Sequence, residues 1–161
     1  MYGVASIRSR IEENMDRYLY KAKRLDNGEW VTGSLLTCED GTCKIATSLL
    51  EVKTNGPILV CAYDVDRDTI CQCTGLRDKN GNLIWENDIL HNGNYFVVKW
   101  NESCSRFDIV LNNSNNIPIG KWEPMICDWK TSDFKEYRKA VDYEVIGNVF
   151  DNPELLEREK K

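Results

Sequence analysis

The chain has 161 residues, which is enough for one domain or for two small modules that share a core. No apolar run approaches the roughly 18 residues of a membrane helix and no charged-then-apolar leader opens the chain, so we expect a cytoplasmic protein without a membrane partner. A net charge of −5 argues against a protein that binds nucleic acid by phosphate neutralisation alone.

Residues 1–16 are expected to form an N-terminal extension or a short helix. Ser9 and Glu12 have the spacing of a capping box, which favours a helix. A competing interpretation comes from the gene: residues 12–14 are compatible with a purine-rich ribosome-binding sequence before an ATG codon. On that hypothesis translation starts at Met15.

Residues 17–70 are predicted to form a small β subdomain. Strands are expected over residues 18–25 and 30–36, on either side of an Asn-Gly turn, and over residues 58–63, whose apolar run is typical of a buried strand. Residues 45–52 fit a strand or a short helix, because periodicity does not separate the two. The acidic residues 64–68 indicate a solvated turn, since they lack the glycine and the final glutamate of an EF-hand loop.

The stretch 71–90 contains the strongest hairpin signal of the chain, the Asn80-Gly81 pair. This pair predicts a type I′ turn, which needs positive φ at both central residues. Further strands are expected over residues 95–100, 107–111 and 143–150, and Gly147 indicates a bulge or bend in the last of them. Residues 112–116 are expected to form a polar loop and residues 117–129 an irregular segment. Pro153 favours a short charged helix over residues 153–161.

Short strands at spacings of about ten residues, separated by glycine turns, indicate a mainly β protein built as a small barrel or sandwich. Three segments also carry a specific pattern: residues 20–30, residues 74–81 with Ile84, Glu86, Asp88 and Ile89, and residues 146–156. Together they resemble the YopX family of phage and prophage proteins, found mainly in Gram-positive bacteria.

The resemblance implies an SH3-like small barrel over residues 71–152, preceded by the smaller β element of residues 17–70. It brings no established activity, no cofactor and no catalytic residues. Two positions depart from the family pattern: Cys73 stands where an aromatic is usual, and Asn87 where glycine is usual, at a possible site of positive φ. The residues that carry the signature, which we interpret as structural, are Thr74, Gly75, Asp78, Asn80, Gly81, Glu86, Asp88, Gly147, Asn148 and Pro153.

Catalysis, if present, would rest on Asp78, Glu86 and Asp88. In an extended chain Glu86 and Asp88 share one face, and paired carboxylates can perform acid–base chemistry. The structural alternative is that Asp78 opens a turn and Asp88 ends a strand, where each accepts backbone N–H bonds. His91 and the cysteines have no evident activating partner, so we favour the structural interpretation.

The seven cysteines are an odd number and do not suggest a disulfide framework. If Asp40-Gly41 forms a two-residue turn, Cys38 and Cys43 lie directly opposite each other. A zinc site would need ligands beyond these, and His91 is the only histidine. We therefore expect small buried thiols and no bound metal.

Two further function classes stay open. A nucleic-acid-binding barrel is suggested by aromatics such as Tyr95, Trp100 and Trp122, and by a local basic patch around Lys21, Lys23 and Arg24. We favour a non-enzymatic, self-associating interaction protein of a mobile element, whose strand edges bind a second copy or a phage or host protein.

Overall fold

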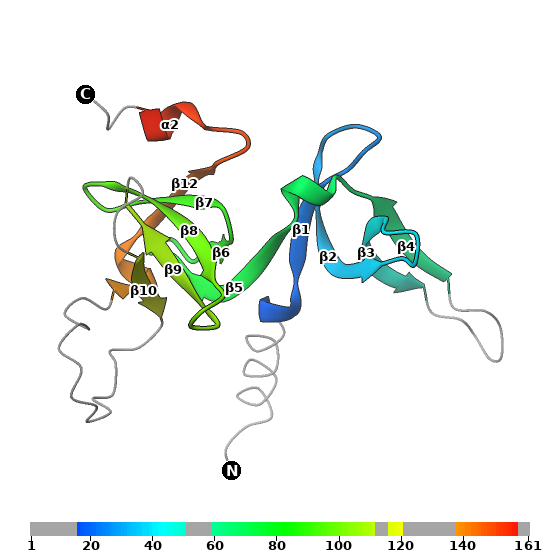
Figure 1. Ribbon diagram of the computed structural model, residues 1–161, viewed down its shortest axis with the longest axis horizontal. Coiled ribbons are helices and arrows are strands. Elements are labelled where there is room, and N and C mark those ends of the chain that lie inside the picture. The colour runs from blue at the N-terminus through cyan, green and yellow to red at the C-terminus, as the bar shows by residue number, and fades with distance from the viewer. Residues whose placement is uncertain (1–15, 51–58, 112–115, 121–137, 158–161) are drawn as a thin grey trace, which may run out of the picture. The chain divides into compact units, whose positions relative to one another are not determined.

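A computed structural model of the chain describes residues 16–50, 59–111, 116–120 and 138–157 (Figure 1). The chain forms two compact units, Met1–Gly75 and Leu76–Lys161, which divide within strand β5 (Cys71–Arg77). The regular structure is nearly all strand, so the predicted mainly β class is confirmed. The division of the chain at residues 16, 70 and 152 stays a prediction. None of the helices in the described ranges is long and apolar enough to span a membrane.

The strands of the N-terminal unit belong to a six-stranded sheet in the order β4-β3-β2-β1-β5-β6, whose paired strands β1–β2, β2–β3, β3–β4 and β1–β5 are antiparallel. Its strands besides β5 are β1 (Tyr20–Lys23), β2 (Trp30–Thr37), β3 (Cys43–Leu50), β4 (Leu59–Asp64) and β6 (Leu83–Trp85). Single turns of 3-10 helix stand at η1 (Asp16–Tyr18) and η2 (Arg67–Thr69). The core of this unit consists of the buried side chains of Ala22, Val31, Cys43, Ile45 and Val65.

The C-terminal unit contains a second six-stranded sheet, in the order β11-β10-β9-β8-β7-β12. Its strands are β7 (Asp88–His91), β8 (Tyr95–Asn101), β9 (Arg106–Val110), β10 (Asn116–Gly120), β11 (Arg138–Lys139) and β12 (Glu144–Asn148). Only the β10–β11 pair is parallel. Two short helices, η3 (Ala140–Asp142) and α2 (Glu154–Glu157), flank β12.

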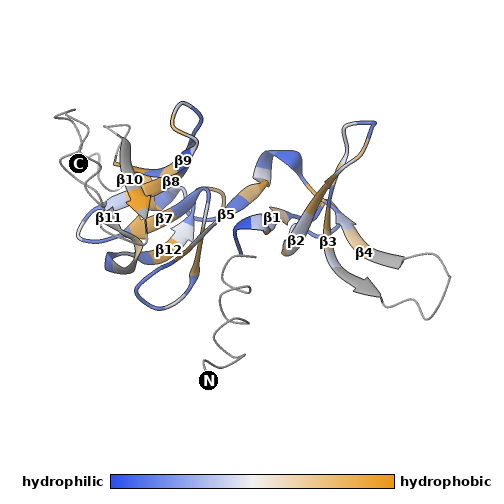
Figure 2. Ribbon diagram, turned by 90° about the horizontal axis from the view of Figure 1, so that it is seen from below, coloured by the Kyte–Doolittle hydropathy of each residue, from blue (hydrophilic) through white to orange (hydrophobic). Residues whose placement is uncertain are grey.

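Apolar residues lie mostly in the strands and polar residues in the connecting turns (Figure 2). The core of the C-terminal unit is formed by Ile84, Leu90, Phe96, Val98, Ile109, Ile119, Ala140 and Tyr143. The rings of Phe96 and Tyr143 meet edge to face, with centroids 5.4 Å apart. Successive strand residues alternate between faces, and in the first part of β8 only every second residue is buried, whereas in β7 three consecutive residues are buried.

The second sheet is open in the described part of the chain, with β11 and β12 as its two edges. No pairing between them closes a barrel there. The described strands of this unit thus form a mainly antiparallel open sheet with one core, and the closed barrel that we expected is not seen among them.

The Asn80-Gly81 turn is not of type I′. Gly81 has a φ of 85°, but Asn80 is not among the residues with positive φ. The Gly81 N–H donates to the Asp78 carbonyl (3.0 Å), and the Asp78 N–H donates to the Asn82 carbonyl (2.9 Å). This is a four-residue turn followed by a left-handed glycine, which is the other common way to close a hairpin with its natural twist.

The hairpin at Asp40-Gly41 has the same design, which corrects the expected position of the cysteines. The Gly41 N–H donates to the Cys38 carbonyl, and Gly41 has a φ of 82°. The extra bulge residue shifts the register, so that Cys43 lies opposite Thr37. Cys38 and Cys43 are therefore not directly opposite each other.

Four further expectations can be compared with the structure along the chain. The described part of residues 45–52 is strand, and the bulge expected near Gly147 is confirmed by a register shift between Val145 and Gly147. The strand predicted over residues 58–63 is present as β4, but Cys61 is exposed, because β4 lies at a sheet edge. The expectation of an irregular segment was wrong for residues 117–120, which belong to strand β10 (Asn116–Gly120). The predicted features in residues 1–15, 51–58, 112–115, 121–137 and 158–161 lie outside the described residues.

At Gly33 the backbones of β2 and β3 leave no room for a side chain. A Cβ atom placed there would lie 2.0 Å from the Ala46 carbonyl oxygen and 3.1 Å from Cγ2 of Ile45. A side chain at this position would push two hydrogen-bonded strands apart.

We expect Gly33→Ala to lower the free energy of unfolding by about 1–3 kcal/mol, since the clash is with backbone and cannot relax by side-chain rotation. Urea titration followed by circular dichroism measures the loss. The matched control is Ser34→Ala at the adjacent exposed position, where the change should stay within about 0.5 kcal/mol. Equal effects of the two substitutions would contradict the steric explanation.

Candidate functional site

Asp78, the first carboxylate considered for catalysis, is only 3% exposed and opens the β5–β6 turn. Its Oδ1 accepts the backbone N–H groups of Asn80 (2.9 Å) and Asn82 (2.8 Å). Its Oδ2 accepts the Val145 backbone N–H (3.0 Å) and the Asn82 side-chain amide (3.2 Å). Four donors therefore occupy the two oxygens, as the structural interpretation of Asp78 requires.

The same turn is bound to the start of β12 by three more contacts. The Lys79 N–H donates to the Tyr143 carbonyl (2.8 Å), and the Lys79 ammonium lies 2.6 Å from a carboxylate oxygen of Glu144. The Asn80 amide donates to the other oxygen of Glu144 (3.2 Å). We call Asp78, Lys79, Asn80, Glu144 and Val145 the turn–β12 latch.

The latch has consequences for two pKa values. Burial opposes ionisation of Asp78, but the N–H donors of Val145, Asn82 and Asn80 outweigh it and hold the pKa of Asp78 below its ordinary value. The hydrogen bond and the charge of Lys79 lower the pKa of Glu144. Both carboxylates are thus stabilised as anions, and neither is held protonated as a general acid would be.

Glu86 and Asp88, the pair considered for acid–base chemistry, do not lie together in one extended segment. Residues 86 and 87 are the two turn residues between β6 and β7, so Glu86 is not in an extended segment with Asp88. Asp88 is 2% exposed, and its Oδ2 accepts the Trp85 backbone N–H (2.8 Å). Asn87 has a φ of 65°, which agrees with the positive φ expected at this position, and its side-chain oxygen accepts the Lys99 ammonium (2.6 Å).

The remaining signature residues also lie in backbone-shaping positions. Thr74 and Gly75 lie within β5, and Gly75 has a φ of 73°, which only glycine adopts without strain. A Cβ at Gly147 would lie 2.3 Å from Oδ1 of Asn152, so glycine leaves room for that side chain. The Asn148 side-chain oxygen accepts the N–H groups of residues 150 and 151, and Pro153 immediately precedes α2.

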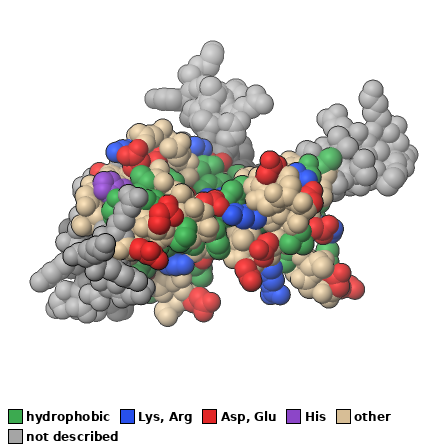
Figure 3. Space-filling view, turned by 90° about the horizontal axis from the view of Figure 1, so that it is seen from above, with side chains coloured by type: hydrophobic (Ala, Val, Ile, Leu, Met, Phe, Trp, Pro, Cys, Tyr) green, Lys and Arg blue, Asp and Glu red, His purple; other side chains and the backbone are tan. Residues whose placement is uncertain are grey.

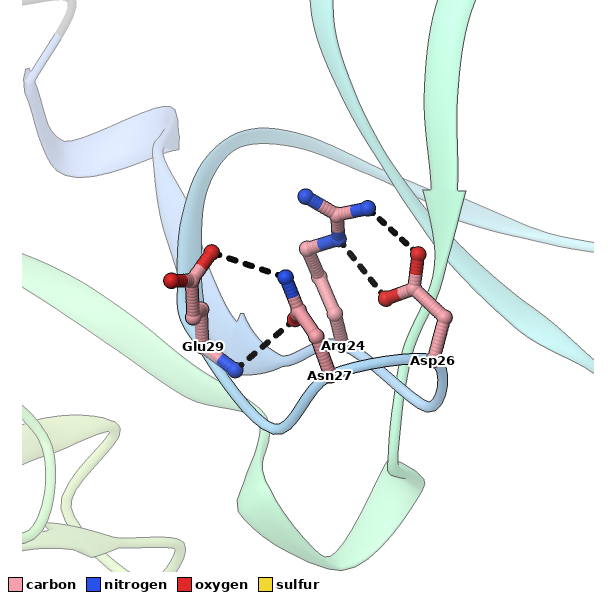
Figure 4. A network of polar contacts seen from close by, with 4 residues as sticks. All are labelled: Arg24, Asp26, Asn27 and Glu29. Atoms are coloured by element: carbon pink, nitrogen blue, oxygen red, sulfur yellow. Dashed lines mark hydrogen bonds and ion pairs between the residues drawn. The ribbon is translucent and has the colours of Figure 1, made fainter.

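A second polar network fixes the β1–β2 loop, residues 24–29 (Figure 4). Arg24 forms a bidentate ion pair with Asp26, whose pKa is lowered by this hydrogen bond, and Nε of Arg24 lies 2.9 Å from Oδ1 of Asp26. The Asn27 amide donates to the Glu29 carboxylate (2.8 Å). The Arg24 guanidinium also lies 4.0 Å from the ring centroid of Tyr63. These contacts link four of the six loop residues to one another or to β4.

The predicted basic patch is smaller than the sequence suggested. The ammonium groups of Lys21 and Lys23 lie 5.2 and 5.6 Å from the Trp30 ring centroid, as cation–π contacts do. Arg24, the third member, is paired with Asp26. On the face shown in Figure 3, basic and acidic side chains are interspersed, with no broad basic area.

The prediction that the cysteines are small buried thiols is confirmed for some of them and wrong for others. Cys43, Cys71 and Cys73 are buried, whereas Cys61 and Cys104 are exposed. Within the described ranges no three His, Cys, Asp or Glu side chains come together as a metal site requires.

One buried charge was missed by the sequence interpretation. Asp108 is fully buried in β9 and accepts hydrogen bonds from Nε of Arg106 (2.8 Å) and from the Asn101 amide (2.6 Å). The spacing of Arg106 and Asp108 places both on one face of a strand, and this was the available signal. The ion pair of Arg106 and Asp108 lies within β9, and the Asn101 amide adds a contact from the end of the neighbouring strand β8.

Comparison with known proteins identifies the family to which the chain is related. A family model described as YopX protein matches residues 19–157. Among solved structures, the chain is similar to protein EF1440 from Enterococcus faecalis, with a TM-score of 0.52 and 23% identity over 85% of this chain and 96% of that chain. This likeness concerns the fold alone. No curated protein matches the chain.

The latch gives a pH-dependent prediction. We expect Asp78→Asn to lower the free energy of unfolding at pH 7 by about 1–3 kcal/mol, because an amide cannot accept all four donors. The wild-type advantage is present above the ordinary Asp pKa of about 3.9 and is lost as the pH falls through the lowered pKa of Asp78.

Urea titrations at pH 7 and pH 3 measure both effects. The matched control is Asp40→Asn in the similarly built exposed hairpin, whose side chain accepts from Thr42 alone and should contribute less. A difference between wild type and Asp78→Asn that is as large at pH 3 as at pH 7 would contradict the role assigned to the Asp78 anion.

Proposed function

The chain belongs to the YopX family, and we propose that it acts as a non-enzymatic, self-associating protein-interaction module of a phage or prophage. We place it in the cytoplasm of a Gram-positive host. Its partners would be a second copy of the chain and a phage or host protein.

The disposition of the carboxylates supports a binding role. Asp78 and Asp88 accept backbone N–H bonds, and Glu144 pairs with Lys79. Acid–base catalysis needs a carboxylate whose proton can be exchanged with substrate near the working pH. The lowered pKa of Asp78 moves that group away from such a role.

The observation that carries the proposal is the openness of both sheets. In the described strands, each sheet ends in edges, β4 and β6 in one and β11 and β12 in the other. An edge strand presents backbone donors and acceptors that can extend the sheet with a strand of another chain. Binding of this kind uses backbone hydrogen bonds and therefore does not depend on a cluster of reactive side chains.

We extend the proposal to architecture and regard the C-terminal unit as an open relative of the SH3-like small barrel. Support comes from the consecutive antiparallel pairing of β7, β8, β9 and β10, with β12 returning beside β7. All of these strands contribute to, or pack against, one core.

Self-association predicts a mass in solution of at least two chains. We expect multi-angle light scattering after size exclusion to give this mass at about 100 μM and a fall toward one chain on dilution, as for a micromolar dissociation constant. A mass of one chain, 18.6 kDa, at every concentration would contradict the self-association.

A second candidate function is nucleic-acid binding, favoured by the lysines beside Trp30. If single strands stack there, oligonucleotide addition at low salt should quench tryptophan fluorescence, and Trp30→Leu should remove most of the quenching. Trp100→Leu, at an exposed tryptophan in the other unit, is the control. Absence of quenching at tens of micromolar protein, about the range of weak non-specific binding, would exclude this candidate.

A further inference from the structure

We propose that two copies of this chain pair through the outer edge of β4, antiparallel and related by a two-fold axis at Cys61. This inference rests on the self-association proposed above and names its surface. The partner is a second copy of the same chain, joined strand to strand.

Three of the four sheet edges in the described residues carry features that discourage pairing. β6 has three residues and β11 has two, and β12 is interrupted by a bulge near Gly147. Short strands and bulges are the usual protection of natural sheet edges. β4 differs: it has six residues, contains no proline or lysine, and the bulge of its hairpin lies in β3.

The free part of this edge is shorter than the strand. The Leu25 N–H donates to the Asp64 carbonyl (3.0 Å), and Arg24 forms a bridge with Val65. The β1–β2 loop, whose internal polar contacts Figure 4 shows, therefore occupies the last position of the edge. What is left open to another chain is residues 59–63.

Two hydrogen bonds show which backbone groups point outward. The Thr47 hydroxyl donates to the Cys61 carbonyl (3.4 Å), and the Val65 N–H donates to the Cys43 carbonyl (3.1 Å), so residues 61 and 65 direct their backbone groups toward β3. Backbone groups alternate between the two sides of an antiparallel strand. Val60 and Ala62 therefore direct theirs away from β3, in agreement with the outward carbonyl of Asp64.

These constraints define the register. Five free residues overlap fully only when the two-fold axis passes through the central one, Cys61. Val60 of each copy then lies opposite Ala62 of the other, and these two hydrogen-bonded pairs supply about four backbone hydrogen bonds. The two Cys61 residues form a non-hydrogen-bonded pair with Cα atoms about 4.5 Å apart, which lies within the range of a disulfide.

The charges are compatible with this register. Asp64 is the one charged residue of β4, and its carboxylate lies 2.6 Å from the Lys44 ammonium. In the antiparallel pair the two Asp64 residues would be six positions apart along the strands, roughly 20 Å at the rise of a β-strand. This separation exceeds the Debye length of about 8 Å at physiological salt, so like charges do not oppose the pairing.

Two variants test the edge directly. Ala62→Pro removes an outward N–H, and Val60→Lys adds a charge that natural edges use against pairing. Each should raise the dimer dissociation constant at least about tenfold in sedimentation velocity experiments. Circular dichroism spectra of each variant establish folding. The matched control is Thr32→Lys, at an exposed position of the interior strand β2, which should leave the dissociation constant unchanged.

Oxidation provides a second, independent measurement on the full chain. Diamide takes two electrons and two protons from two thiols to give one disulfide, and we expect a covalent dimer whose linking peptide contains Cys61. Cys61→Ser should abolish it, whereas Cys104→Ser, at another exposed thiol, should retain it.

The outcomes separate the two levels of the proposal. A wild-type chain that is monomeric at every concentration contradicts self-association and with it the β4 pairing. A wild-type oligomer that survives both edge variants and yields no Cys61–Cys61 link contradicts the β4 surface alone. Loss of the oligomer in Thr32→Lys as well as in the edge variants would likewise overturn the assignment to β4.

Discussion

The C-terminal unit depends on one buried anion, Asp78. Its Oδ2 binds the N–H of Val145, 67 residues later in the chain, while its Oδ1 shapes the turn that it opens. A buried carboxylate is stable only when its oxygens are occupied by donors, and here backbone groups of two distant segments provide most of them. The same contact places the start of β12 beside the turn, and Tyr143, the largest fully buried side chain, immediately precedes β12. The latch and the core of the C-terminal unit are therefore structurally linked at the start of β12.

The polar side chains of the other turns act in the same way over shorter distances. Asp40 accepts from Thr42, Asp66 caps η2, and Asn148 accepts two N–H groups of the turn before α2. Such contacts satisfy backbone donors that no strand partner reaches. The Asp and Asn side chains of these turns are thus explained by the backbone groups that the turns of a mainly β chain leave without a strand partner.

Local features were predictable from sequence, and pairings over long distances were not. The Asn-Gly and Asp-Gly pairs located the hairpins, and Asn87 was placed correctly at a position of positive φ. The turn type at Asn80-Gly81 was wrong, because a bulged turn and a type I′ turn use the same residues. An extra bulge residue of the same kind in the Asp40-Gly41 hairpin places Cys43 opposite Thr37. The Asp78–Val145 contact could not be predicted, since nothing in either segment specifies the other.

The mismatch at β4 is the most informative difference between expectation and structure. The apolar run over residues 58–63 is typical of a strand with partners on both sides, yet β4 has β3 on one side only, and Cys61 is exposed. Natural sequences are consistent across levels except where function demands otherwise. The composition of β4 is that of an interior strand, although β4 lies at an edge. Composition and position would agree if a second chain supplied the missing neighbouring strand. The β1–β2 loop, which covers Asp64 and stops there, limits that neighbour to the five residues before it.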